Sequence, residues 1–363
     1  MNKIKNYSIN QNQIHIEFEG YERIVAVLGD TIFNFREASI SDLQFNIETK
    51  DNIKFITYRD NDNINIVTSS YKVVIKDDFM IDIYQNDNLL SSDNVVLERD
   101  IDSINYELLE KEGHSVNKKN KNKFVWNKKI NKDDYIYGLG EKTGFLNKRS
   151  YDYEMWNTDN PAPQVDCFKA LYKSIPFFIV HNKEYNYGYF FDNTYKSYFD
   201  LGKENTDYIK IAFDKGNINY FFFGGKTIKD VIEGYTSITG KAPLPQRFTL
   251  GHQQSRWSYM NKDELLLIAK EYRKNNIPCD TLFLDIDYMD HYKVFTYSEK
   301  SFPNLKDTIE KLNNEGFKVV TIIDPGVKKE VGYKIYDEAI KNDYAATLNK
   351  ETYINEVWPG QAI

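Results

Sequence analysis

The hydrophobic periodicity of the chain changes at the segment KAPLPQRF, which contains Pro243 and Pro245. Before this segment, apolar residues recur at every second position, as in Ile14, Ile16 and Phe18. A period of two is typical of strands with one buried face, and many short strands punctuated by Asn, Asp and Gly favour an antiparallel β-sandwich. Because proline neither continues a helix nor donates to a central strand ladder, we place a domain boundary between residues 242 and 243.

After the boundary the pattern becomes an alternation of strands and helices. Continuous apolar runs such as TLFL and VVTII are typical of a parallel sheet covered by helices. An eight-fold βα barrel needs ~250 residues, so residues 243–363 form either the first part of such a fold or a smaller α/β unit. We expect no helix after the third strand. The predicted elements are strands at Phe248–Gln253, Cys279–Ile286 and Phe317–Asp324, with helices from Asn261 or Lys262 to Lys274 and at Asn304–Asn314.

Two segments of the N-terminal part depart from the strand pattern. Residues Thr227 to Ile238 are predicted to form a short helix, and residues 111–123 (KEGHSVNKKNKNK) are polar and basic enough to form an exposed loop. The glycine pair in YIYGLGE, from Tyr135 to Glu141, could be read as a phosphate-binding loop. No helix is expected to follow it, so a tight turn between strands is the better interpretation.

Composition excludes several classes of partner. The chain has 363 residues, 47 Lys and Arg against 54 Asp and Glu, and a net charge of -7, which disfavours a nucleic acid. The opening MNKIKNYSINQNQ has no apolar core, and no run of about 18 apolar residues occurs, so we expect a cytoplasmic protein without a membrane segment. Cys167 and Cys279 lie far apart without metal-ligand spacing, so no metal or disulfide is expected.

Polar and aromatic side chains follow each predicted strand of the C-terminal part. The second strand ends on Asp285, the third on Asp324, and the first runs into Trp257. Singly, an Asp after an apolar run is more often a helix cap or turn former. Together, at the carboxyl ends of adjacent parallel strands, they indicate a site for a polyol, because carboxylates accept hydroxyl hydrogen bonds and Trp offers a flat face to C–H groups.

Asp285 and Asp287 of the run LFLDIDYMD could also be the carboxylate pair of a glycosidase. In a retaining enzyme the two carboxyls flank the scissile bond, ~5–5.5 Å apart. Residues two apart on one strand share a face, whereas a catalytic pair normally comes from different strands. We therefore do not assign these two residues as nucleophile and acid.

Several longer segments carry a resemblance to a known family. They are YIYGLGEKTGFLNKRSYDYEMWNTD (Tyr135–Asp159), LYKSIPFFI (Leu171–Ile179), PLPQRFTLGHQQSRWSY, LDIDYMD and EVWPGQ. In this order and spacing the chain resembles glycoside hydrolase family 31, which contains α-glucosidases, α-xylosidases, sulfoquinovosidases and α-glucan lyases. The similarity covers most of residues 135–363, and DIDYM with MWNTD upstream looks most like the α-glucosidase branch.

The resemblance implies an N-terminal antiparallel β-sandwich over residues 1–242, followed by the first βα units of a (β/α)8 TIM barrel over residues 243–363, truncated. It also implies a pocket for the terminal non-reducing sugar of an oligosaccharide or α-glucoside, and no cofactor. Asp285 resembles the aspartate that binds glucose hydroxyls, and Asp159 the aspartate that a sandwich loop extends over the pocket. The other pocket residues implied by position are Trp257, Ile286, Ile322, Asp324 and Trp358.

The family's nucleophile lies in a W-x-D-M-N-E type segment that does not occur in this sequence. The resemblance therefore places the nucleophile and the acid/base beyond Ile363 and no catalytic residue within the chain. The leading hypothesis is a portion of a retaining, exo-acting α-glucosidase, inactive alone. The alternatives are a non-catalytic carbohydrate-binding sandwich module whose incomplete barrel associates with a partner, or a relative acting as α-xylosidase, transglycosidase or lyase.

Overall fold

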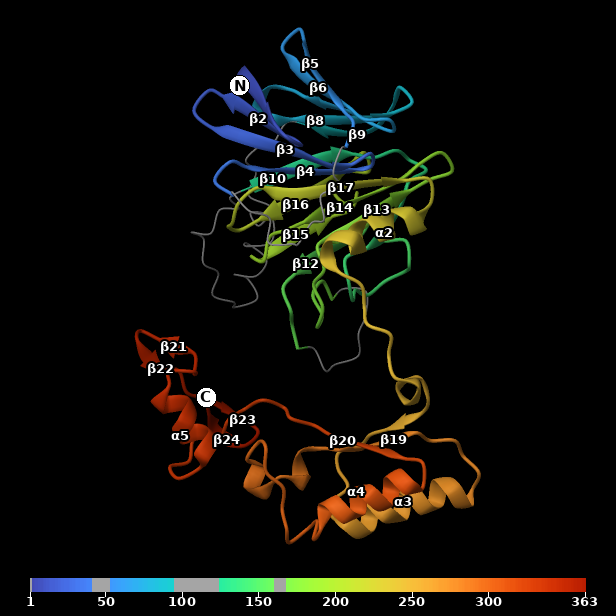
Figure 1. The fold of residues 1–363 in the computed structure, drawn as a ribbon, viewed down its shortest axis with the longest axis vertical. Helices are drawn as coiled ribbons and strands as arrows, with labels where there is room; N and C mark the ends of the chain where they lie inside the picture. The colour runs from blue at the N-terminus through green and yellow to red at the C-terminus, as the bar shows by residue number, and fades with distance from the viewer. Residues whose placement is uncertain (1, 41–52, 95–123, 160–167) are drawn as a thin grey trace. The chain divides into compact units, whose positions relative to one another are not determined.

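The computed structural model describes residues 2–40, 53–94, 124–159 and 168–363 (Figure 1). The chain divides into two compact units, Met1–Lys241 and Ala242–Ile363. The loop predicted at residues 111–123 lies outside the described residues.

Two large antiparallel sheets make up the N-terminal unit (Figure 1), which confirms the predicted β-sandwich. An eight-stranded sheet has the order β1-β2-β3-β4-β17-β14-β13-β11, and a nine-stranded sheet has the order β12-β15-β16-β10-β9-β8-β7-β6-β5. The first contains β1 (Ile4–Asn10), β2 (Gln13–Phe18), β3 (Glu22–Gly29), β4 (Ile32–Glu37), β11 (Tyr135–Gly138), β13 (Phe177–His181), β14 (Asn186–Phe191) and β17 (Asn219–Gly225). The second contains β5 (Ile56–Asp60), β6 (Asn63–Val67), β7 (Lys72–Ile75), β8 (Ile81–Gln85), β9 (Asn88–Asn94), β10 (Phe124–Lys129), β12 (Asp152–Met155), β15 (Ser197–Asp200) and β16 (Tyr208–Phe213), and a 3₁₀ turn, η1 (Asp77–Phe79), joins β7 to β8.

Aromatic side chains fill the space between the two sheets. Trp126 of the nine-stranded sheet lies with its ring centroid 6.0 Å from that of Tyr220 of the other sheet. Phe191 and Phe213 meet across the same core at 5.6 Å. Large rings bury much apolar area, so much of the Tyr and Phe content stabilises this core.

One helix, α2 (Ile228–Thr239), packs on the eight-stranded sheet beside β17, β14 and β13 (Figure 1). The Tyr235 ring stacks on Phe177 with centroids 4.0 Å apart, and Val231 is fully buried. A capping box starts the helix, because Thr227 accepts from the Asp230 backbone while the Asp230 carboxylate accepts from the Thr227 backbone. The predicted helix from Thr227 to Ile238 is confirmed to within one residue at each end.

The C-terminal unit begins with a parallel three-stranded sheet, β18 (Gln253–Gln254), β19 (Thr281–Leu284) and β20 (Lys318–Thr321). Helices α3 (Lys262–Lys274) and α4 (Leu305–Asn314) share its apolar core, to which Leu265, Leu282 and Leu312 contribute buried side chains. Asn261 caps α3 by accepting a hydrogen bond from the Glu264 backbone. The order of strands and helices is that of the start of a TIM barrel, as predicted.

Two element predictions were wrong. The strand at Phe248–Gln253 is a 3₁₀ turn, η2 (Arg247–Leu250), followed by the two residues of β18, because Thr249 bonds back to the Gln246 carbonyl through its amide and its hydroxyl. A helix, α5 (Lys334–Lys341), does follow the third strand; with eight residues and no fully buried side chain, it carries little sequence signal.

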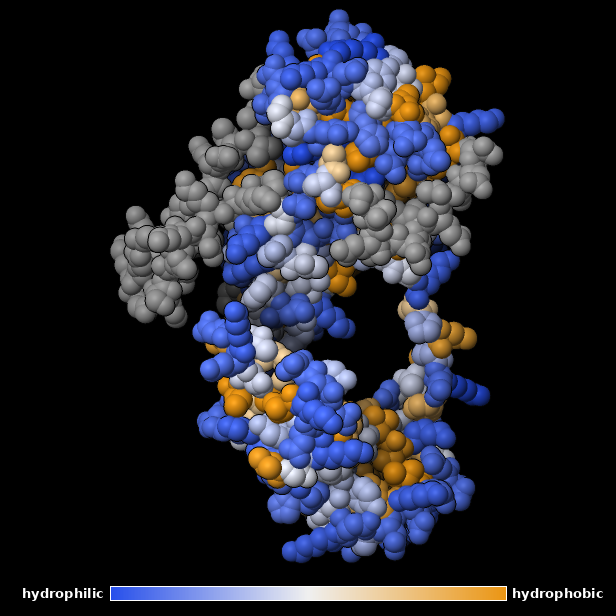
Figure 2. All heavy atoms as spheres, turned by 60° about the vertical axis from the view of Figure 1, so that its left-hand side comes forward, coloured by the Kyte–Doolittle hydropathy of each residue, from blue (hydrophilic) through white to orange (hydrophobic). Residues whose placement is uncertain are grey.

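Two hairpins end the described chain, and apolar side chains reach the surface of this unit. The hairpins are β21 (Thr347–Leu348) with β22 (Glu351–Thr352), and β23 (Asn355–Val357) with β24 (Gly360–Ala362). Figure 2 shows hydrophobic atoms on the visible face of the C-terminal unit. Exposed apolar surface favours association, so contact with a partner through an incomplete barrel stays a prediction. Exposed apolar residues of this unit include Leu250, Leu267, Ile277 and Val331.

Candidate substrate-binding site

The ends of β19 and β20 bring four of the predicted site residues to one edge of the parallel sheet. Leu284 pairs with Thr321, and the Ile322 amide donates to the Leu284 carbonyl at 2.9 Å. Asp285 and Ile286 therefore leave the sheet beside Ile322, with Asp324 two residues further on. This edge is the carboxyl end of the strands, where βα barrels carry their active sites.

Asp285 has a local structural role and a free oxygen. It is the N-cap of a 3₁₀ turn, η3 (Ile286–Tyr288), and its Oδ1 accepts from the Ile286 amide at 2.7 Å. Within the described part of the chain no donor is seen for Oδ2. The half-buried carboxylate is thus held in orientation while one oxygen remains available for a hydroxyl.

Tyr288 connects the turn that follows β19 to the residue that follows β20. Its ring is buried, and its hydroxyl donates to the Ile322 carbonyl at 2.9 Å. Sequence reasoning missed this residue, although its position three residues after Asp285 in LDIDYMD fits a side chain that folds back under the turn. The bond fixes the backbone at Ile322, a predicted pocket residue.

Asp287 serves the neighbouring loops. Its Oδ2 accepts from the Ser258 hydroxyl at 2.7 Å, and its Oδ1 accepts from the Tyr292 hydroxyl at 3.0 Å. The hydrogen bond to this carboxylate raises the pKa of Tyr292. Asp287 therefore ties the segment after β18 to the 3₁₀ turn η4 (Asp290–Tyr292), and both of its oxygens are in use.

The aromatic residues predicted for the pocket differ in their surroundings. Trp257 follows β18 and is 80% exposed. Trp358 lies in the turn between β23 and β24, and its ring meets Tyr292 edge-on with centroids 5.8 Å apart. The hairpin is attached to the loop after β20, because the Lys329 amide donates to the Gln361 carbonyl at 2.8 Å. Trp358 is thus held by its contact with Tyr292 and by the attachment of its hairpin to the loop after β20, whereas the side chain of Trp257 is mostly exposed.

Asp324 and Asp159 complete the predicted set. Asp324 is exposed and has a left-handed backbone (φ 46°), and its carbonyl accepts from the Gly326 amide at 2.7 Å in a turn. Asp159 lies in the N-terminal unit after β12, where it accepts from the Tyr172 hydroxyl at 2.7 Å. A common pocket for Asp159 and Asp285 stays a prediction.

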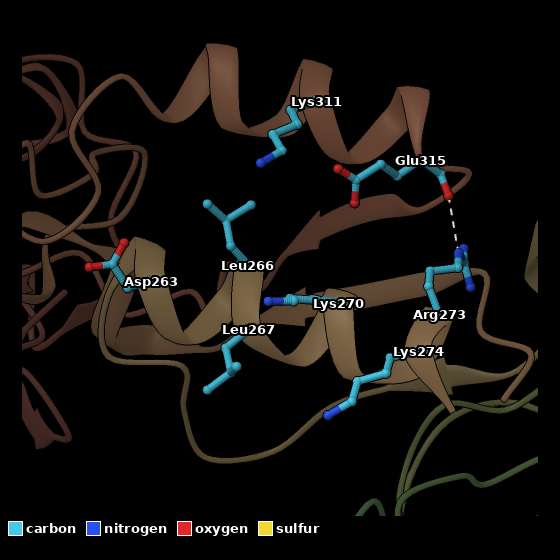
Figure 3. A pocket seen from close by; sticks show the side chains of 8 residues that line it. All are labelled: Asp263, Leu266, Leu267, Lys270, Arg273, Lys274, Lys311 and Glu315. Atoms are coloured by element: carbon cyan, nitrogen blue, oxygen red, sulfur yellow. Dashed lines mark hydrogen bonds between the residues drawn. The ribbon is translucent and has the colours of Figure 1, made fainter. Parts of the chain in front are cut away.

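A groove between α3 and α4, of about 790 Å³, has a different character (Figure 3). Lys270, Lys274 and Lys311 line it beside Leu266, and none of the predicted site residues does. Arg273 donates to the Glu315 carbonyl at 3.2 Å, the bond drawn in Figure 3. The groove lies on helices, away from the strand ends that carry Asp285.

Two negative findings apply to the described residues. No three His, Cys, Asp or Glu side chains there come together as a metal-binding group, and Cys279 is a buried free thiol, whereas Cys167 lies outside the described residues. No helix in the same part of the chain has the length and apolarity needed to cross a membrane.

Two family models match the chain over most of its length. Residues 24–200 match the glycosyl hydrolase 31 N-terminal galactose mutarotase-like domain, and residues 242–363 match the glycosyl hydrolases family 31 TIM-barrel domain. The chain belongs to glycoside hydrolase family 31. The family prediction and the predicted fold class are confirmed.

Named relatives of this family 31 chain include α-glucosidases. "Alpha-glucosidase 2" of Bacillus thermoamyloliquefaciens is 44% identical over 236 residues, which cover 65% of this chain and 30% of that protein. An "Alpha-glucosidase" of Saccharolobus solfataricus is 32% identical over 242 residues, 67% of this chain and 35% of that protein. A structure of the Flavobacterium johnsoniae GH31 dextranase complexed with isomaltotriose has a TM-score of 0.84 at 27% identity, covering 99% of this chain and 43% of the dextranase. The chain spans less than half the length of these relatives.

Proposed function

We propose that this chain provides the sugar-binding first part of a retaining, exo-acting α-glucosidase, which hydrolyses terminal non-reducing α-linked glucose. The observation that carries this function is the half-buried Asp285 carboxylate at the carboxyl end of a barrel strand, held through one oxygen and open at the other. The 44% identity to an α-glucosidase supports the choice of sugar and linkage type.

In this function Asp285 accepts hydrogen bonds from hydroxyls of the bound glucose. Ile286, Ile322 and Trp358 form apolar walls, and Asp159 contributes from the sandwich domain. No residue of the chain attacks the anomeric carbon or protonates the leaving oxygen; those two carboxylates would follow Ile363. The chain then orients the ring, so that the oxocarbenium-like transition state forms between the two carboxylates.

A second candidate substrate is an α-glucan of the dextran type. The structural likeness to a dextranase complexed with isomaltotriose favours it, because that likeness covers 99% of this chain. Both candidates place an α-linked glucose in the same pocket. A higher kcat/KM for isomaltotriose than for an aryl α-glucoside would favour the dextran-type substrate, and the reverse order would favour the α-glucosidase.

The decisive change is Asp285→Asn, made in a polypeptide that extends this chain to the length of its relatives. A hydrogen bond to a charged group contributes about 1.5–3 kcal/mol, so kcat/KM for an aryl α-glucoside should fall on the order of tenfold to a hundredfold. The asparagine keeps an acceptor for the Ile286 amide, so the turn should persist.

Asp280→Asn is the matched control, since Asp280 lies directly before β19, at the other end of the same strand. It should leave kcat/KM unchanged. An Asp285→Asn enzyme as active as the control would refute the role of Asp285. Hydrolysis of any α-glycoside by the 363-residue chain alone would refute the placement of the catalytic carboxylates after Ile363.

A further inference from the structure

Three aromatic rings gather on the outer surface of the sandwich, at the edge of the eight-stranded sheet. Tyr135 and Tyr137 lie on β11, the last strand of that sheet, on either side of the buried core residue Ile136. Since alternate residues of a strand share a face, the two tyrosines point away from the core. His181 of β13 pairs with Tyr135, and the three ring centroids lie 6.1–6.5 Å apart.

A cavity of about 700 Å³ borders this aromatic cluster. Tyr135 and His181 line it together with polar residues of the segment before β11 and of the β13–β14 turn. Tyr135 is 49% exposed, so a ligand in the cavity can reach its ring face. The volume falls within the range of small-molecule sites, roughly 300–1,000 Å³.

A buried hydrogen-bond network holds the floor of the cavity in one arrangement. The buried Asp134 accepts at Oδ1 from the Tyr185 hydroxyl at 2.7 Å and from Asn182 at 2.9 Å, and at Oδ2 from the Asn131 amide at 2.8 Å. Arg149 donates to the Asn131 carbonyl at 2.7 Å. A site whose walls are already ordered loses little entropy when a ligand binds.

The side chains at the rim are polar and balanced in charge. The exposed residues Lys132, Asp133, Lys183 and Glu184 all line the cavity. Within the described residues, none of their side chains has a hydrogen-bond partner. Two positive and two negative groups do not favour an anion or a cation. Exposed aromatic faces together with mixed donors and acceptors suit a neutral ligand rich in hydroxyls.

We propose that this aromatic cluster and its cavity form a second carbohydrate-binding site, separate from Asp285, which holds an α-glucan chain. Sugar C–H groups lie on the Tyr135 face, and hydroxyls bond to the rim. The existence of the site rests on its geometry, whereas the choice of an α-linked glucan rests on the proposed function. Such a site keeps a polymeric substrate attached to the sandwich.

The experiment is affinity electrophoresis of the full 363-residue chain in native gels that contain glycogen, with a mixed-linkage β-glucan gel in parallel. Glycogen should retard the chain and the β-glucan should not. Removing an aromatic contact should weaken binding about fivefold, so Tyr135→Ala should raise the glycogen dissociation constant by about that factor. Tyr135→Phe keeps the ring and should bind like the wild type.

Tyr58→Ala is the matched control, because Tyr58 on β5 is 41% exposed and lies outside the cluster. It should leave retardation unchanged. A wild-type chain that glycogen does not retard, or a Tyr135→Ala variant that binds like the wild type, would overturn the second site. Equal retardation by the β-glucan would overturn its assignment to an α-glucan.

The two proposals fail separately. Weaker glycogen binding by Tyr135→Ala supports the second site, whatever Asp285→Asn does to hydrolysis. Unchanged hydrolysis by an Asp285→Asn variant of the extended polypeptide refutes only the proposed function. Conversely, an inactive Asp285→Asn enzyme with unaltered glycogen binding by Tyr135→Ala supports the function and refutes the second site.

Discussion

A buried ion pair in the sandwich core allows a quantitative test of how the N-terminal unit is stabilised. Lys128 of β10 and Asp93 of β9 have side chains only 3% and 2% exposed, and Nζ lies 2.7 Å from Oδ1. The ammonium group also lies 4.3 Å from the ring centroid of Tyr189 and 4.9 Å from that of Tyr220. The second Asp93 oxygen accepts from the Ile81 amide at 3.2 Å.

Lys128→Met removes the positive charge and leaves the Asp93 carboxylate buried with one backbone donor. Breaking a buried pair from one side costs about 3–5 kcal/mol of unfolding free energy. Adding Asp93→Asn removes the unpaired charge and keeps an acceptor for the Ile81 amide. The double variant should therefore recover about half of the loss, because two neutral groups need no counter-charge.

The loss should depend on pH. Burial raises the pKa of Asp93, against the opposing effect of Lys128, and removing Lys128 raises this pKa further. A carboxyl whose pKa is higher in the folded than in the unfolded state binds its proton more readily when folded, so its penalty grows as pH rises through the folded pKa. The cost of Lys128→Met should thus be larger at pH 7 than at pH 5.

Urea denaturation measures both effects. With Trp257 and Trp358 changed to Phe, selectively excited tryptophan fluorescence comes only from Trp126 and Trp156 of the N-terminal unit. Lys76→Met is the control, since Lys76 pairs with Asp82 at 2.8 Å but is 28% exposed, and it should cost about 1 kcal/mol or less. Equal costs for the two single variants, or a double variant no more stable than Lys128→Met, would refute the reasoning.

Two further predictions concern a helix start and a loop anchor. Thr227→Ala removes one half of the capping box of α2 and should cost about 1 kcal/mol, whereas Thr227→Ser should restore stability; urea denaturation measures both, and no loss in the alanine variant would contradict the cap. Asp287→Ala removes the acceptor of the Ser258 and Tyr292 hydroxyls, so amide hydrogen exchange in residues 255–260 and 290–293 should speed up; unchanged exchange would show that Asp287 does not hold these loops.

Those parts of the fold that depend on local residue patterns could be predicted from the sequence. Ile14, Ile16 and Phe18 alternate with polar residues and are all buried in the structure, because the strand period alone decides which face they occupy. The start of α2 was readable for the same reason, since Thr227 and Asp230 form the cap within one turn.

Features that depend on partners far apart in the sequence could not be predicted from it. The segment Phe248–Leu250 has apolar residues at both ends, yet Leu250 is 76% exposed and the segment forms a turn, because the parallel ladder to β19 starts only at Gln253. The pair of Lys128 with Asp93 joins residues 35 positions apart. Both residues lie on strands, and hydrophobic periodicity says nothing about which charges meet.

Asp285 and Asp287 of the candidate site illustrate both kinds of feature, those set by local pattern and those set by distant partners. The residue pattern placed Asp285 and Asp287 together at a strand end, and only the family resemblance named Asp285 as the sugar-binding residue. The structure distinguishes them by their donors: Asp287 accepts from Ser258 and Tyr292 with both oxygens, whereas Asp285 accepts from Ile286 with one. A carboxylate with both oxygens bonded by the protein must lose a contact to accept a hydroxyl, so Asp285 is the less costly acceptor for the sugar hydroxyl that the proposed function requires.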